Sequence, residues 1–410
     1  MKTREEENEE LAKAVINTFV RNPVTRRKAL STMAKAGIIA GLVAAFGAGF
    51  GTGYATAPPK STGYTPPPKG YIYGLDVEHP ELSLWFVNHV TTNPFFTPTI
   101  YGIQDACNMI GNCKYVWTGS ENSVVTDMVN AIYSAISSGA DGIATTVIAP
   151  NSFDAPPIQE ALSKGIPVYA YNAYIPNDDP HYAQYHNPPY LGYVGQDLYS
   201  SGELIANKWI LPNIKPNQRV ALFIATPPGT ANIQPRIDGI LSVLQANGYS
   251  TVDVVATGAL VSQEQSAVEA YFDGHPDVAA MIAVDAGSTL SIGNVLREHG
   301  IPSLTNGGKI LAGGGYDLLP GTVSNIVDGY LDFTIDQQPY LQGFLPALYL
   351  YLYLLTNGLE VVYFSNTGIK FVTKQNVTPY TYTSRFEGST TSEPVWTTGM
   401  YPQLTNSTSS

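Results

Sequence analysis

The stretch that decides the fold is Asp332-Phe333-Thr334-Ile335-Asp336-Gln337-Gln338-Pro339-Tyr340-Leu341-Gln342-Gly343. Residues 333–335 are typical of a short buried strand, and Pro339 suits the first turn of a helix, where its missing N–H costs nothing. The helix that follows is apolar and aromatic through Leu355. One carboxylate and two carboxamides lie between strand and helix, which is where ligands bind in an open α/β sheet. The alternative is a polar turn in which Asp336 or Gln338 only caps the helix.

Upstream of this stretch, apolar strands alternate with amphipathic helices from residue 70 onward. Such alternation predicts parallel, doubly wound sheets. One series ends near Tyr171 and a second begins at Tyr193, which predicts two lobes in a chain of 410 residues. The late strand and helix around residues 333–356 return the chain to the first lobe, so we expect a multi-strand hinge. The predicted fold class is α/β, with two doubly wound parallel-sheet lobes and an N-terminal transmembrane or signal helix.

The predicted divisions of the chain follow these patterns. They are a cytoplasmic segment at 1–35, a transmembrane anchor or signal segment at 36–54, a Pro-rich linker at 55–69, a first ligand-binding lobe at 70–192 plus 338–365, a second lobe at 193–337 plus 366–400, and a flexible tail at 401–410.

The N-terminal region predicts export and a membrane anchor. Residues 36–53 carry no charge and are about long enough to span a bilayer. Basic residues precede them, so the N-terminus should be cytoplasmic and the rest extracytoplasmic, at the cell surface. Residues 25–30 resemble a twin-arginine export signal, and residues 28–31 resemble an archaeal pilin-type processing site. Pro58 directly follows a small-x-small sequence and blocks cleavage there, so we expect an uncleaved or pilin-type-processed anchor.

Composition and cysteine content exclude several classes of partner. Residues after position 57 hold 13 Lys or Arg against 28 Asp or Glu, which argues against nucleic acid, because its binding needs a basic face. Cys107 and Cys113 are the only cysteines. In an oxidising compartment we expect them to form a local disulfide, and the alternative is a pair of reduced core thiols. Two cysteines without a nearby histidine make too few ligands for a metal, and no cofactor is expected.

Polar and aromatic side chains gather where the predicted strands end. The carboxyl ends of parallel strands meet in one crevice, which predicts a shared ligand site. Hydroxyl groups both donate and accept hydrogen bonds, and an aromatic ring packs against the apolar face of a pyranose. This inventory therefore predicts a neutral, polyhydroxylated ligand. The candidate ligand-binding residues are His89, Asn93, Phe95, Phe96, Asn172, Arg236, Asp285, Asp317 and Gln337.

These candidates have structural alternatives. The alternatives are core packing for Phe95, Phe96 and His89, helix capping for Asp285 and Asp317, and an exposed helix charge for Arg236. The coincidence of such residues at six strand ends carries the prediction, and no single residue does.

Several short motifs resemble the ribose/galactose-type solute-binding proteins of ABC sugar importers. They cover roughly residues 70–365 and occur in this order: Asn93-Pro94-Phe95-Phe96, Gly139-Ala140-Asp141-Gly142-Ile143, Gly165-Ile166-Pro167-Val168, His275-Pro276-Asp277-Val278, Gly315-Tyr316-Asp317 and Asp336-Gln337-Gln338-Pro339. The resemblance implies a periplasmic-binding-protein-like fold of type I. It also implies first-lobe contacts at Asn93, Phe95 and Phe96, second-lobe contacts at Arg236, Asp285 and Asp317, and a hinge glutamine at Gln337.

The chain departs from ribose binders at Tyr171-Asn172-Ala173, where the pattern expects Asp-Arg, and it lacks the aromatic residue expected near Val261. Asn172 can still bond to a hydroxyl, whereas Ala173 cannot. Fold and class survive these departures, and the identity of the sugar stays open.

The resemblance and the site together predict a membrane-tethered receptor. It would capture a sugar by hinge closure and deliver it to an ABC permease and its ATPase, without covalent chemistry. The chain lacks a Gly-x-Ser-x-Gly elbow, a metal-binding His pair and a phosphate loop, so no enzyme is predicted. Three alternatives stay open: a sugar or autoinducer sensor that signals to a membrane partner, a glycoside-acting enzyme built on paired Asp residues, and a repressor-like regulator. The last would need an N-terminal helix-turn-helix where this chain has its apolar segment.

Overall fold

The computed structural model of the chain describes residues 79–149, 155–174, 190–225, 231–258 and 260–381. The predicted cytoplasmic segment, membrane anchor, Pro-rich linker and C-terminal tail lie outside these residues. Among the described residues, no helix combines the length and the apolar character needed to cross a membrane.

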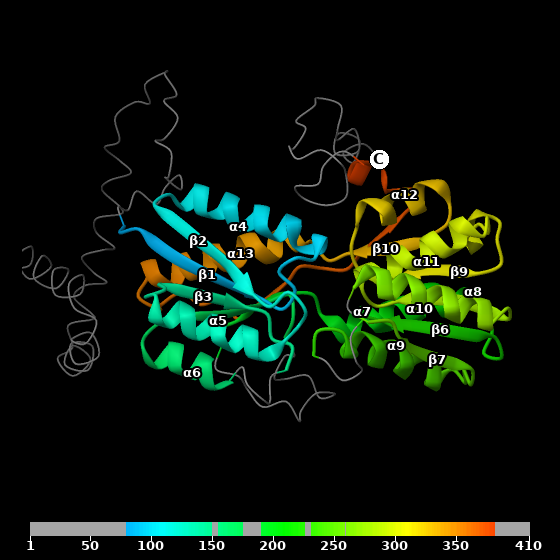
Figure 1. The fold of residues 1–410 in the computed structure, drawn as a ribbon, viewed down its shortest axis with the longest axis horizontal. Coiled ribbons are helices and arrows are strands. Elements are labelled where there is room, and N and C mark those ends of the chain that lie inside the picture. The colour runs from blue at the N-terminus through cyan, green and yellow to red at the C-terminus, as the bar shows by residue number, and fades with distance from the viewer. Residues whose placement is uncertain (1–78, 150–154, 175–189, 226–230, 259, 382–410) are drawn as a thin grey trace, which may run out of the picture. The chain divides into compact units, whose positions relative to one another are not determined.

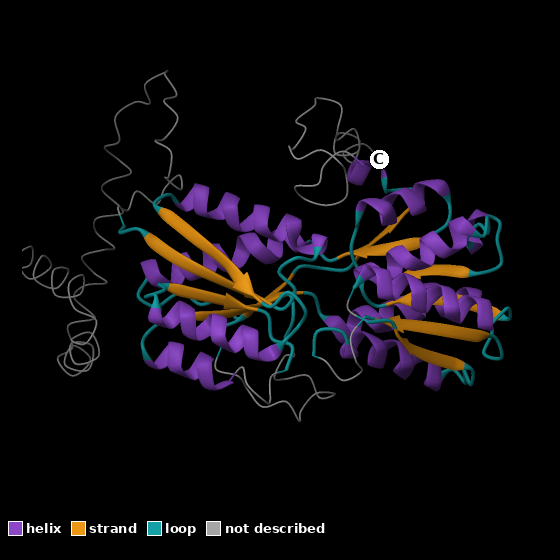
Figure 2. Ribbon diagram, in the orientation of Figure 1, coloured by secondary structure: helices purple, strands orange, loops and turns teal. Residues whose placement is uncertain are grey.

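A six-stranded parallel sheet forms the core of the first lobe (Figures 1 and 2). Its strands, in spatial order, are β11 (Phe364–Asn366), β5 (Tyr193–Gly195), β4 (Val168–Tyr171), β3 (Gly142–Thr145), β1 (Leu82–Asn88) and β2 (Cys113–Gly119). Its helices are α4 (Thr97–Ile110), which follows the 3-10 turn η1 (Pro94–Phe96), α5 (Val125–Ser137), α6 (Ala155–Ser163) and α13 (Pro339–Leu355). Helices α4 and α13 cover one face of the sheet, and α5 and α6 cover the other (Figure 1). This arrangement confirms the predicted doubly wound parallel sheet.

A four-stranded parallel sheet forms the core of the second lobe. Its strands, in spatial order, are β7 (Val252–Ala256), β6 (Arg219–Ile224), β8 (Val278–Ala283) and β9 (Leu311–Gly314). Its helical segments are α7 (Leu198–Ile205), the π-helical turn η3 (Ala206–Ile210), α8 (Leu211–Asn213), α9 (Gln234–Ala246), α10 (Val261–Gly274), α11 (Ala286–Glu298), η4 (Leu304–Asn306), α12 (Pro320–Asp328) and η5 (Thr378–Thr381). Strands β10 (Phe333–Asp336) and β12 (Lys370–Thr373) form a separate antiparallel pair.

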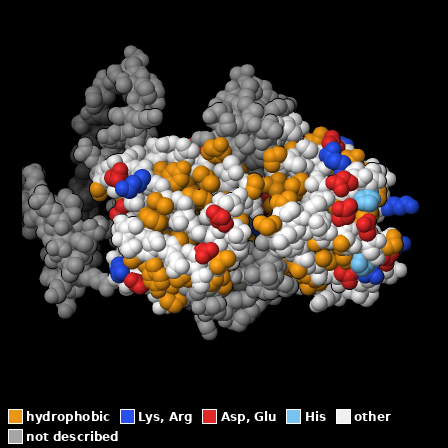
Figure 3. Space-filling model, in the orientation of Figure 1, with side chains coloured by type: hydrophobic (Ala, Val, Ile, Leu, Met, Phe, Trp, Pro, Cys, Tyr) orange, Lys and Arg blue, Asp and Glu red, His pale blue; other side chains and the backbone are white. Residues whose placement is uncertain are grey.

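Burial explains the composition of the strands. Every residue of β3, β4 and β8 is buried, as expected for parallel strands covered by helices on both faces. On the face drawn in Figure 3, charged side chains are sparse and lie mainly toward the outer ends of the two lobes. The low charge content of the sequence thus corresponds to large buried sheets and a largely uncharged surface on this face.

The lobe boundary differs from the prediction at β5. We expected Tyr193 to open the second lobe, but β5 pairs with β4 through Ala170 and Tyr171 and with β11 on its other side. All three residues of β5 are buried in the first sheet. The chain therefore leaves the first lobe after Gly195, and it leaves again between β11 and β12 rather than at residue 365.

Three connections link the two lobes: β5 to α7, β10 to α13, and β11 to β12. These connections are joined by side-chain hydrogen bonds. Gln196 Nε2 donates to the Gly368 carbonyl at 3.2 Å, and Gln342 Nε2 donates to Thr367 Oγ1 at 3.2 Å. Gln338 Nε2 also donates to the Thr367 carbonyl. The three connections thus form one hydrogen-bonded group.

Each lobe contains a pair of helices whose backbones touch. In the first lobe, a Cβ atom at Gly102 of α4 would overlap the backbone of α13, and one at Gly343 of α13 would overlap α4. In the second lobe, Gly202 of α7 and Gly239 of α9 stand in the same reciprocal relation. No residue larger than glycine fits at these four positions without moving a helix.

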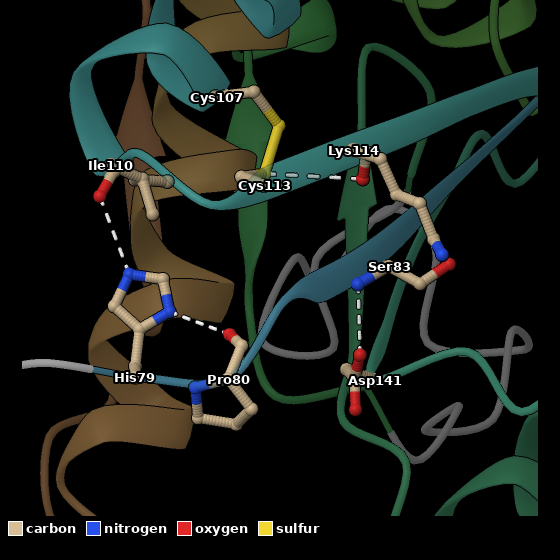
Figure 4. The surroundings of a disulfide bond; sticks show 8 residues. All are labelled: His79, Pro80, Ser83, Cys107, Ile110, Cys113, Lys114 and Asp141. Carbon is tan, nitrogen blue, oxygen red and sulfur yellow. Dashed lines mark hydrogen bonds between the residues drawn. A yellow bond between two sulfur atoms is a disulfide. The ribbon is translucent and has the colours of Figure 1, made fainter. Parts of the chain in front are cut away.

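A disulfide joins Cys107, near the end of α4, to Cys113, the first residue of β2 (Figure 4). Gly111 and Asn112 form the intervening turn with φ angles of 69° and 41°. The predicted disulfide is therefore confirmed, together with the turn that makes it possible.

Candidate functional site

One cavity receives residues from both lobes. It holds about 640 Å³ of space free of protein atoms, part of which is open solvent. Eight of the nine predicted ligand-binding residues line it: His89, Asn93, Phe95, Phe96, Asn172, Arg236, Asp285 and Asp317. They come from segments that follow the carboxyl ends of β1, β4, β6, β8 and β9. The crevice predicted from strand ends is therefore present.

The first-lobe wall of the cavity is aromatic. The rings of Phe95 and Phe96 lie edge to face with centroids 4.6 Å apart, and both side chains are buried. Asn93 caps the turn that carries them, because its Oδ1 accepts a hydrogen bond from the Phe95 amide at 2.9 Å. Trp117 supports Phe96 from behind, at a centroid distance of 5.9 Å. The aromatic pair is thus both packed and presented to the cavity.

His89 lies on the same wall in its neutral form. Burial lowers the pKa of His89 to about 4. With the proton on Nδ1, the ring donates to Thr146 Oγ1 at 3.1 Å and accepts at Nε2 from Asn232 Nδ2 at 3.5 Å. Asn232 belongs to the second lobe, so this contact joins the lobes. His89 is therefore buried, as the core-packing alternative expected, and also lines the cavity.

Arg236, on α9, is the cation of the second-lobe wall. It is only 5% exposed, so the alternative of an exposed helix charge is wrong. Its guanidinium lies 3.5 Å from the ring centroid of Tyr316 and donates to the Val284 carbonyl at 2.9 Å. A second amino group points toward Gln337 Oε1 at 3.3 Å. These contacts fix the guanidinium plane, as a preorganised binding site requires.

Two carboxyl groups flank Arg236. Asp285 caps α11 through a 2.7 Å bond from the Ser288 amide to Oδ1, so the capping alternative holds for that oxygen. Burial raises the pKa of Asp285 to about 6, and the hydrogen bonds from Ser288, together with the nearby Ala225 amide, oppose this rise. The Ala225 amide does not reach hydrogen-bonding geometry, so Asp285 Oδ2 has no partner among the described residues. Asp317 caps no helix, because α12 begins at Pro320. Burial also raises the pKa of Asp317, and the Arg236 charge opposes this.

Backbone strain is concentrated around this cavity. Asn172, Tyr316, Asp317 and Gln338 have φ angles of 61°, 53°, 99° and 58°. Asparagine tolerates the left-handed region, whereas the other three adopt it at a cost. Hydrogen bonds hold this geometry, since the Asp317 amide donates to the Ile335 carbonyl and Thr334 Oγ1 donates to the Asp317 carbonyl. Strained residues are typical of ligand sites.

Gln337 does not line the cavity. Its Nε2 donates to Asp317 Oδ1 at 2.8 Å, and its Oε1 accepts from Gln342 Nε2 at 3.1 Å. Gln342 Oε1 in turn accepts from Asn172 Nδ2 at 2.9 Å. Gln337 therefore connects Asp317 of the second lobe, through Gln342, to Asn172 of the first lobe.

Sequence reasoning missed several cavity residues. Glu264, Ser123, Asn232 and Gly287 line the cavity together with Val90, Ile233, Ala225 and Ala286. All of these lie beyond a strand end, and three of them, Glu264, Ala286 and Gly287, are on the first turn of the next helix. Glu264, on α10, comes eight residues after β7 ends. An acidic residue in the first turn of a helix was the available signal, but that pattern is also ordinary helix stabilisation.

Two parallel α/β lobes that share one polar and aromatic cavity define a solute-binding protein. The chain belongs to the family described as the periplasmic binding protein domain, which matches residues 82–358. Membership of this family makes it a binding protein, as predicted.

Known proteins similar to this chain include one curated relative and several solved structures. The chain is 62% identical over 400 residues to the xylose/arabinose-binding protein XylF of Sulfolobus acidocaldarius, covering 97% of this chain and 98% of the relative. An ABC transporter solute-binding protein from Burkholderia graminis in complex with D-arabinose is 25% identical, with a TM-score of 0.64 over 74% of this chain and 99% of that chain. A similar protein from Agrobacterium vitis with bound D-fucose is 20% identical, with a TM-score of 0.62 over 72% and 96%. The predicted family resemblance is thus confirmed.

Proposed function

We propose that this chain captures a sugar in the cavity between its lobes and delivers it to the permease of an ABC transporter. The observation that carries the proposal is the pairing of aromatic rings with buried polar atoms that have no partner. Within the described part of the chain, Arg236 Nε, Asp285 Oδ2 and Asn232 Oδ1 are buried and make no hydrogen bond. Such atoms are costly unless a ligand satisfies them. Phe95 and Phe96 offer an apolar surface beside them.

Within this proposal, the polar residues bind hydroxyl groups and the aromatic pair packs against the sugar ring. A carboxyl group accepts from hydroxyls, whereas the guanidinium donates to them, so the two kinds of group hold opposite sides of each hydroxyl. Asn93, Asn172 and His89 complete the first-lobe side. Gln337 acts as a positioning residue for Asp317 and Arg236.

The proposed ligand is an aldopentose. The relative named for xylose and arabinose binding is 62% identical across nearly the whole chain, which supports carrying its ligand class over. A pentose also agrees with a neutral ligand held by carboxyl, amide and aromatic side chains.

Closure of the two lobes is the proposed mechanism of capture. The three connections between the lobes are short and lie next to one another, which suits bending at one place. Closing around the sugar would remove water from its hydrogen bonds and strengthen them. The first lobe would comprise residues 70–195 and 338–366, and the second lobe residues 196–337 and 367–400.

The chain would work outside the cytoplasm, held at the membrane by residues 36–54. The uncharged sequence of that segment and the basic residues before it support this topology. Removal of residues 1–57 should release the protein from washed membranes. Continued membrane association after that deletion would contradict the anchor.

Calorimetric titration and thermal unfolding of the purified chain test the sugar proposal. The panel contains D-xylose, L-arabinose, D-arabinose, hexoses, disaccharides and myo-inositol. A sugar at 100 times its dissociation constant should raise the free energy of unfolding by about 2.7 kcal/mol. We expect pentoses to give the largest effect. If no sugar on the panel binds, the proposed function is wrong.

A further inference from the structure

Glu264 is the most unusual side chain of the cavity. It lies in the first turn of α10 and is 4% exposed. Its carboxyl group rests against Gly287, in the first turn of α11, where a Cβ atom would overlap Glu264 Oε2. Gly287 therefore provides the space through which Glu264 reaches the cavity. A buried carboxyl needs a compensating partner, because desolvation of this group is expensive.

The free carboxyl oxygen of Glu264 belongs to a set. Oε2 has no hydrogen-bond partner among the described residues. The same is true of Asp285 Oδ2, Arg236 Nε and Asn232 Oδ1, and all four residues line the same cavity. Unpaired buried polar atoms are rare in proteins. Ser123 Oγ, in the same cavity wall, also lacks a partner within the described part of the chain, so five such atoms surround one cavity, which indicates that a polar molecule completes their hydrogen bonds.

Two carboxyl groups in this set favour hydroxyl groups over an anion as the ligand chemistry. Burial, and then the charge of Asp285, raises the pKa of Glu264 to about 8. At neutral pH this carboxyl group therefore keeps its proton, so it can donate one hydrogen bond and accept another. A sugar hydroxyl matches both functions.

We propose that Glu264 is a further ligand-contacting and specificity-determining residue, which bonds directly to one hydroxyl of the bound sugar beside Asp285. This inference rests on the proposed function and adds a contact that the strand-end pattern did not contain. It assigns to α10 a direct part in recognition, whereas the other second-lobe contacts come from α9, the start of α11 and the loop after β9.

The structural alternative is that Glu264 only joins α10 to α11 or stabilises the first turn of α10. That role predicts a loss of stability without a change in ligand discrimination. A stability measurement alone cannot separate the two roles, since a buried residue contributes to folding in both.

The experiment is calorimetric titration of the purified full chain and its variants with the pentose that binds the wild type most tightly. Glu264→Ala should weaken binding about tenfold or more, the equivalent of one hydrogen bond left unmade. Glu264→Gln keeps the shape, one donor and one acceptor, so it should stay within a few-fold of the wild type. Glu269→Gln, on the same helix but outside the cavity, is the matched control and should leave the affinity unchanged.

Mono-deoxy analogues of that pentose identify direct contact. For one position of the sugar, removal of the hydroxyl should weaken binding to the wild type but leave binding to Glu264→Ala nearly unchanged, because the partner is already absent. If every analogue loses the same affinity in both proteins, or if Glu264→Ala binds like the wild type, the inference is overturned while the sugar-binding proposal stands. If the wild type binds no sugar, both are overturned.

Discussion

Replacement of Asp317 by alanine should separate ligand binding from folding. Asp317 is 4% exposed, lines the cavity and accepts one bond from Gln337 Nε2 at 2.8 Å. Because Asp317 lines the cavity, we expect its other oxygen and remaining lone pairs to accept from two sugar hydroxyls. Burial raises the pKa of Asp317, and the charge of Arg236 opposes that rise. The carboxyl group is thus held in place before the ligand arrives.

The expected loss of affinity follows from these two bonds. Bonds to a neutral acid contribute about 1 kcal/mol each, and bonds to an ionised one contribute about 1.5–3 kcal/mol each. Removing both would cost about 2–6 kcal/mol, which corresponds to a weakening of roughly 30-fold to 20,000-fold. The cost to the empty protein is smaller. It comprises one lost hydrogen bond of about 1 kcal/mol and the strain of alanine at φ 99°, of similar size.

Titration calorimetry and a thermal unfolding curve on the same preparation measure both quantities. Asp317→Gly is the control, because glycine accepts a positive φ without strain. It should lose affinity as Asp317→Ala does but retain more stability. Near-normal affinity in either variant, together with a lowered melting temperature, would refute the ligand role and leave Asp317 as a structural residue.

Four other measurements test the fold and its electrostatics. Small-angle scattering should give a smaller radius of gyration with bound pentose, and an unchanged radius with proven binding would remove the closure mechanism. Replacing Cys107 and Cys113 by serine should lower the free energy of unfolding by about 2 kcal/mol for so short a loop, and no loss in a denaturant titration would contradict this. Gly102→Ala should cost about 1–3 kcal/mol through overlap with the facing helix, whereas Gly274→Ala, with open space around it, should be neutral or stabilising. Because the pKa of Glu264 is raised from 4.5 to about 8, the folded protein without ligand binds that proton more tightly than the unfolded chain, so its free energy of unfolding should fall as pH rises through this range. The free energy of unfolding of Glu264→Gln should fall less over the same range. Parallel curves of stability against pH for the two proteins would contradict the raised pKa of Glu264.

Sequence patterns predicted most of the fold because helix and strand periods are local properties. The strand predicted at residues 333–335 is part of β10, and the helix predicted from Pro339 is α13, which ends at Leu355. The assignment of β5 failed because three apolar residues contain no signal for which sheet they join. That choice is made by pairing with Ala170 and Tyr171 of β4.

The candidate site was predictable where a functional residue directly follows a strand. His89 and Asn172 meet that condition, and Asp285 comes two residues after the end of β8. Glu264 was not predicted, because its burial, the missing hydrogen-bond partner of Oε2 and its contact with Gly287 are properties of the packed structure. Gln337 was predicted to contact the ligand but lies behind the cavity wall for the same reason, since two of its side-chain partners, Arg236 and Asp317, are 101 and 20 residues away in the sequence.

The glycine crossings have a consequence for how force would pass through the molecule. Helices α7 and α13 each start directly after a connection between the lobes; α7 touches α9, which bears Arg236, and α13 touches α4, which directly follows the aromatic pair. In the second lobe, Arg236 lies one turn before Gly239 on α9, and the Arg236 carbonyl faces Gly202 of α7. In the first lobe, Phe96 directly precedes α4, and α4 meets α13 at Gly102. A rotation at the connections would therefore move the guanidinium and the aromatic pair directly, because the close backbone contacts leave the paired helices little room to shift relative to each other.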